Sequence, residues 1–78
     1  MARRYNYDYS KLKGKLREKA LVYKAFAEIL GLSESSVSER LNNNAQFTQE
    51  EMEKTMLFLE IPLEEVERYF FTHIVQKN

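Results

Sequence analysis

Carboxylates and one histidine are the residues of this 78-residue sequence that could take part in acid–base or metal chemistry. His73 is the only histidine, and the absence of Cys leaves no thiolate that could join it in a zinc site. The Glu residues cluster at 50–53 and 64–67, where helix starts and solvent-facing sides favour negative charge. No Gly-rich phosphate loop is present. We therefore expect a protein without enzymatic activity or cofactor, and we interpret His73 as a packing or edge-strand residue.

The charges are unevenly distributed, although the formal net charge is zero. Glu dominates from Ala25 onward, whereas Asp8 and Glu18 are the only acids before it. The basic residues of the first part are Arg3, Arg4, Lys11, Lys13, Lys15, Arg17, Lys19 and Lys24. Such an asymmetry indicates an anionic partner for the basic part. An equally well supported alternative is that these basic residues only form a solvent-exposed helix face and bind no partner.

Residues 26–42 predict two short helices joined by a tight turn. Gly31 can adopt the left-handed conformation that ends a helix, and Ser33 follows as the N-cap of the next one. In that second helix Val37 and Leu41 are four residues apart, so they share an inward-facing side. The pattern is that of a helix-turn-helix.

Three residues make this stretch resemble the helix-turn-helix of phage repressor and Cro-type regulators. Ala27 stands where two closely crossing helices leave room for a small side chain only, Gly31 forms the turn, and Val37 packs the second helix against the first. The resemblance covers about residues 8–60, and an ordinary helical hairpin is the alternative. It implies a mainly α fold: a five-helix, repressor-like helix-turn-helix domain with short N- and C-terminal β arms.

The resemblance assigns a binding role to helix 33–42. In helix-turn-helix regulators the second helix of the motif enters the major groove, with its N-terminal residues at the base edges. Ser can donate or accept hydrogen bonds there, and Glu can accept one from the cytosine amino group. The predicted DNA- or partner-binding residues are Tyr23, Lys24, Glu34, Ser35, Ser36, Ser38, Glu39, Arg40, Asn42 and Asn43.

Two features of this site depart from the family pattern. Val22 and Tyr23 stand where a Thr or Ser cap and a phosphate-binding Gln are usual. The predicted recognition helix also offers Glu34 and Glu39 against Arg40, whereas duplex DNA binding depends on Lys and Arg. Two hypotheses follow: a Cro- or repressor-type transcriptional regulator that binds double-stranded operator DNA, or an antirepressor or modulator that docks the same acidic face on a phage repressor protein.

A first helix is predicted before the motif. Asp8 can cap it, and Leu12 and Leu16 form a buried stripe that continues to about Lys19. Gly14 interrupts this helix at a propensity penalty of about 1 kcal/mol relative to Ala. We expect close packing at Gly14 to account for it.

Two further helices are predicted after the motif. Thr48 and Glu51 have the spacing of a capping box, which starts a helix that ends near residue 60. Pro62 then breaks the chain and suits the first turn of a fifth helix over residues 63–68. Leu63 is expected to face inward in that helix.

Strand-like composition marks both ends of the chain. Tyr alternates with polar residues over 3–7, and residues 69–76 are rich in aromatic and β-branched types. Because a lone strand is not stable, we expect these arms to meet in a small sheet or to pair with a second subunit.

The sequence indicates a single domain over residues 1–78, with a helical core at 8–68 and arms at 3–7 and 69–76. No run approaches the ~20 apolar residues of a membrane-spanning helix. The lack of Cys is compatible with a reducing compartment. We therefore expect a cytoplasmic protein of the bacterial host cell, and the small size favours a homodimer.

Overall fold

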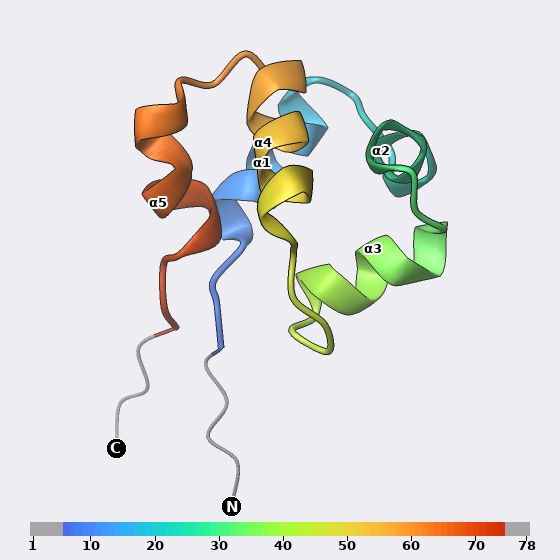
Figure 1. Ribbon diagram of the computed structural model, residues 1–78, viewed down its shortest axis with the longest axis horizontal. Coiled ribbons are helices and arrows are strands. Elements are labelled where there is room, and N and C mark those ends of the chain that lie inside the picture. The colour runs from blue at the N-terminus through green and yellow to red at the C-terminus, as the bar shows by residue number, and fades with distance from the viewer. Residues whose placement is uncertain (1–5, 75–78) are drawn as a thin grey trace, which may run out of the picture.

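The computed structural model describes residues 6–74, which form five α-helices and one 3-10 turn (Figure 1). This confirms the predicted mainly α class. The elements are α1 (Ser10–Glu18), α2 (Tyr23–Leu30), α3 (Glu34–Leu41), α4 (Gln49–Phe58), η1 (Leu63–Glu65) and α5 (Val66–Phe70).

The core lies where the five helices meet. In the view of Figure 1, α2 and α3 lie on one side of α4 and α5 lies on the other. Leu12 and Leu16 of α1 are buried, as their four-residue spacing predicts. The side chains with almost no exposed surface are Phe26, Leu12, Leu16, Met56, Leu59, Val37 and Thr55. Every helix except the short α5 contributes to this set, so the helices stabilise one another through a common core.

The turn between α2 and α3 follows the predicted chemistry. Gly31 caps α2 with a left-handed φ of 74°. Ser33 caps α3, because its hydroxyl accepts a hydrogen bond from the Ser36 N–H at 3.2 Å. Ala27 and Val37 are both buried where the two helices pack. The helix-turn-helix arrangement is therefore present.

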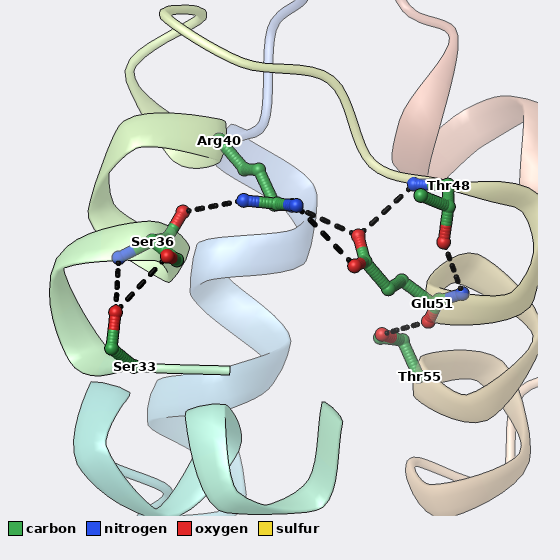
Figure 2. Close-up of polar contacts among 6 residues, drawn as sticks. All are labelled: Ser33, Ser36, Arg40, Thr48, Glu51 and Thr55. Carbon is green, nitrogen blue, oxygen red and sulfur yellow. Dashed lines mark hydrogen bonds and ion pairs between the residues drawn. The ribbon is translucent and has the colours of Figure 1, made fainter. Parts of the chain in front are cut away.

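The start of α4 is the capping box that the sequence predicts. The Thr48 hydroxyl accepts from the Glu51 N–H at 3.1 Å, and the Glu51 carboxylate accepts from the Thr48 N–H at 3.0 Å (Figure 2). Two otherwise unpaired N–H groups at the helix start are satisfied in this way.

The predicted β arms are wrong in the part of the chain that the structure describes. Tyr7 and His73 form a single antiparallel bridge, and no strand is present within residues 6–74. Tyr69 and Phe70 belong to α5 and are buried. With Val66 they recur at helical spacing, so packing against the core overrides their strand propensity. Residues 3–5 and 75–76 lie outside the described residues.

The two ends do lie side by side, as expected. The Asp8 N–H donates to the Thr72 carbonyl at 2.6 Å, and the Ile74 N–H donates to the Asn6 carbonyl at 2.9 Å. The ring of His73 lies 5.1 Å from that of Tyr7, which agrees with a packing role.

Two smaller expectations fail. A Cβ added to Gly14 would meet nothing within 4 Å, so close packing does not account for this glycine. Leu63 is 58% exposed and does not face inward. Glu60, at a left-handed φ of 59°, and Pro62 turn the chain before η1, and this turn directs Leu63 to the surface.

Candidate functional site

The outward side of α3 carries the polar residues that the sequence singled out. We define the exposed α3 face as Glu34, Ser35, Ser38, Glu39 and Asn42, which occupy one arc of the helix. All are exposed except Ser38, which is half-buried. The Asn42 amide donates to the Ser38 hydroxyl at 3.3 Å.

Glu34 and Glu39 give this face its charge. Among residues 6–74, neither carboxylate has a Lys or Arg partner within ion-pair distance. The face therefore presents negative charge together with hydroxyl and amide groups that can donate or accept hydrogen bonds.

Arg40 lies apart from the exposed α3 face. Its Nε donates to Glu51 Oε1 at 2.9 Å and its Nη2 to Oε2 at 3.4 Å, while Nη1 donates to the Ser36 carbonyl at 3.2 Å (Figure 2). The side chains of Arg40 and Glu51 are only 16% and 11% exposed. The one arginine of helix 33–42 is thus neutralised by α4 and fastens α3 to it.

Glu51 is the centre of this connection, and it was not among the predicted site residues. The same carboxylate accepts from Arg40 and from the Thr48 N–H, and the Glu51 carbonyl accepts from the Thr55 hydroxyl at 2.8 Å (Figure 2). The spacing of Thr48 and Glu51 revealed the capping box. Nothing in the local sequence around Glu51 points to Arg40, because the two residues belong to different helices.

Asn43 is half-buried, and its side chain contacts the N-terminal segment instead of joining the exposed α3 face. Its amide donates to the Tyr7 carbonyl at 3.0 Å and accepts from the Tyr7 N–H at 2.9 Å. Its φ of 66° is left-handed, a conformation that Asn tolerates better than most residues. Asn43 thus holds the N-terminal segment against the end of α3.

Ser36 belongs to the cap of α3. Its N–H and hydroxyl both hydrogen-bond the Ser33 hydroxyl, and its carbonyl accepts from Arg40 (Figure 2). Of the ten predicted residues, Ser36, Arg40 and Asn43 therefore make intramolecular contacts that position α3.

Tyr23 and Lys24 lie at the start of α2. Lys24 is exposed, whereas Tyr23 is half-buried against the core. Val22 makes no side-chain hydrogen bond to cap the helix, as its residue type predicts, and it is 66% exposed.

A groove that the sequence did not reveal runs between α1 and the start of α2. We define the α1–α2 groove as the hollow of about 580 Å³ lined by Lys13, Leu16, Arg17, Ala20, Leu21, Val22, Tyr23 and Glu34. Its lining brings Tyr23 and Glu34, two predicted residues from different helices, to one hollow. Lys13 and Arg17 line the same hollow, so basic groups lie beside the acidic end of the exposed α3 face.

Known proteins resemble this chain over most of its length. A solved structure of the modulator of repression (MOR) of the temperate bacteriophage TP901-1 from Lactococcus lactis is 39% identical, with a TM-score of 0.70, and the match covers 85% of this chain and 89% of that chain. The predicted likeness to small phage regulators is confirmed at this level, but it does not single out the Cro type. No curated protein matches the chain.

The residues described by the structure include no helix long and apolar enough to cross a membrane.

The model of the family described as "Protein of unknown function (DUF739)" matches residues 5–73. With nearly the whole sequence matched, the chain belongs to this family.

Proposed function

We propose that this protein is a modulator of a phage repressor and that it binds the repressor protein through the exposed α3 face. The likeness to a phage modulator of repression, at 39% identity, supports this proposal over a Cro-type DNA binder. It acts without catalysis or cofactor, in the cytoplasm of the bacterial host where the repressor works.

The observation that carries the proposal is the division of charge on α3. Glu34 and Glu39 are exposed and, within the described chain, unpaired, while Arg40 is neutralised by Glu51. Binding of duplex DNA draws much of its free energy from Lys and Arg that neutralise phosphates. A negative face opposes DNA but complements the basic surface with which a repressor reads it.

The arrangement also suggests how such a modulator acts. A repressor reads its operator with the N-terminal residues of its own recognition helix. Docking Glu34 and Glu39 on the basic groups around that helix covers the surface that DNA needs. Ser35 and Asn42, both exposed, supply hydrogen bonds that fix the register of the complex.

Titration calorimetry with the purified cognate repressor tests the proposal. The Glu34→Lys, Glu39→Lys double variant is expected to bind at least about tenfold more weakly, because it reverses two charges that face basic groups. The Glu18→Lys, Glu28→Lys double variant is the charge-matched control, since both residues are exposed acids on α1 and α2 and lie outside the exposed α3 face. Unchanged affinity of the Glu34→Lys, Glu39→Lys variant, or an equal loss in the control, contradicts the proposed surface.

Direct binding of operator DNA is the second candidate function. The helix-turn-helix geometry and the exposed Lys24 favour it. A titration with operator fragments over a salt series separates the two functions, because the slope of log affinity against log salt is about −0.9 per phosphate contacted. Our proposal predicts weak, unsaturated binding, whereas tight binding with a steep slope favours the DNA-binding function. A homodimer, which would double either set of contacts, stays a prediction.

A further inference from the structure

Large apolar side chains are exposed along α4 and η1, away from the helix-turn-helix. Leu57 is 79% exposed and Leu63 is 58% exposed, although core positions on the same stretch are filled by Met56 and Leu59. Leu57 points out because it lies opposite the buried side of α4, which is formed by Glu51, Thr55 and Met56. These exposed side chains contribute nothing to the core.

The exposed side chains line two adjoining hollows. We define the α4–η1 groove as the hollow of about 440 Å³ lined by Glu50, Glu53, Lys54, Leu57, Ile61 and Leu63. A second hollow of about 340 Å³ adjoins it and is lined by Gln49, Met52, Glu53, Leu63, Val66 and Phe71. Glu53 and Leu63 line both hollows, so the apolar surface is continuous around Leu63. Contiguous apolar surface with a polar rim is typical of protein-binding sites.

The rim of the groove is acidic. Glu50 and Glu53 line it directly, and over residues 60–68 the exposed acids Glu60, Glu64 and Glu67 outnumber the exposed Arg68. Lys54 is the basic residue of the lining, and it pairs with Glu50 at 3.5 Å. The potential around the apolar floor is therefore negative, which disfavours nucleic acid and anionic lipid as occupants.

We propose that the α4–η1 groove binds a cationic amphipathic helix of a partner protein. Aliphatic side chains at helical spacing fill the hollows on both sides of Leu63, and flanking Lys or Arg residues lie against Glu50 and Glu53. Amphipathic helices of partner proteins commonly bind with their apolar face in such a hydrophobic groove. The acidic rim favours a helix whose flanking residues are basic.

Within residues 6–74, a second copy of this chain does not supply that helix. The basic α1 has its apolar residues, Leu12 and Leu16, buried in the core. A further described region that combines basic and apolar residues, around Arg17 and Val22, is itself a hollow. Two concave surfaces cannot fill one another.

The groove is separate from the exposed α3 face. Figure 1 places α5 on one side of α4 and α3 on the other. The inference thus goes beyond the proposed function, because it adds a second contact surface that stands or fails independently of the first.

Nuclear magnetic resonance titration of the isotope-labelled full chain tests the inference. The probes are a panel of short synthetic helical peptides with Leu on one face and Lys on the flanks, differing in Leu spacing, each matched by a peptide with Glu for Lys. We expect saturable amide shift changes centred on Leu57, Ile61 and Leu63. The matched acidic peptide is expected to bind at least about tenfold more weakly.

Variants of the groove residues test whether the peptide binds in the α4–η1 groove. Leu57→Asn with Leu63→Asn is expected to abolish saturable binding and to leave the fold intact, because both side chains are exposed. The control is Glu34→Lys, Glu39→Lys, which should bind the peptide as the wild type does. The inference is overturned if no peptide of the panel binds, if the acidic peptides bind equally well, or if the shift changes map to α3.

Discussion

Glu39 and Arg40 are adjacent on α3, but their side chains lie in opposite environments. Glu39 is exposed and has no ion pair within residues 6–74, whereas Arg40 is held between Glu51 and the Ser36 carbonyl. One side of the helix thus keeps its charge available to a partner, and the other side uses its charge to fasten α3 to α4. A polar residue on a recognition helix is a candidate contact only if the rest of the fold leaves it unpaired.

The largest expected effect comes from replacing Arg40, the residue of these two neighbours that is buried in an ion pair. Arg40→Met leaves the Glu51 carboxylate nearly buried without its cation, which costs about 2 to 3 kcal/mol in the free energy of unfolding. Urea denaturation measures the loss. A double-mutant cycle with Glu51→Gln isolates the ion pair, since Arg40→Met should cost much less in that background. A loss of the same size in both backgrounds would show that the contact with Glu51 is not the cause.

Asn43 is expected to give the next largest effect. Asn43→Ala removes both hydrogen bonds to Tyr7 and places at the left-handed φ a residue that tolerates it less well than Asn does, so it should cost about 2 kcal/mol. Asn43→Gly removes the same hydrogen bonds but tolerates the φ, and about 1 kcal/mol is expected. Thermal unfolding compares the two variants. Equal losses would argue that backbone strain plays no part at this position.

Glu39→Lys should change stability by less than about 0.5 kcal/mol, because the side chain is exposed and unpaired. The same substitution should weaken repressor binding, which would sharpen the contrast with its neighbour Arg40. Unfolding and calorimetry on one protein preparation measure both quantities. A marked loss of stability would mean that Glu39 has a structural role.

The smallest expected effect concerns Asp8, an exposed carboxylate with partners. Hydrogen bonds from the Ser10 side chain and N–H lower the pKa of Asp8 below its ordinary value of 3.8, and Lys13 lowers it further. The folded state therefore favours the carboxylate. Its contribution is present at pH values above 3.8 and is lost as pH falls through the lowered folded-state pKa.

The contribution of Asp8 is checked by measuring the free energy of unfolding over a series of acid pH values. The wild type should lose slightly more stability on acidification than Asp8→Asn does, because the variant has no proton to bind at this site. If the unfolding free energies of the two proteins depend on pH in the same way, Asp8 does not contribute to stability.

Local signals were enough to predict most helix starts and ends. The Ser33 cap, the Gly31 turn and the Thr48–Glu51 box each act within one helical turn, so their spacing in the sequence reveals them. The C-terminal arm was predicted wrongly because strand propensity is weak against burial, and Tyr69 and Phe70 gain more by packing in α5.

The candidate site was predictable only in part, for a different reason. Glu34, Ser35, Glu39 and Asn42 are exposed as expected, but Arg40 and Asn43 find partners on distant segments of the chain. Such pairings depend on tertiary packing and leave no periodic pattern. The exposure of Leu63, and with it the α4–η1 groove, likewise depends on how the chain turns at Glu60.

Mapping the repressor on the isotope-labelled protein by nuclear magnetic resonance tests the central claim most directly. We expect the DNA-binding part of the repressor to shift the amide signals of Ser35 and Glu39, and operator DNA to compete for the repressor. Unchanged signals on repressor binding would contradict repressor docking on the exposed α3 face, as would saturable shifts caused by operator DNA alone with a steep salt dependence.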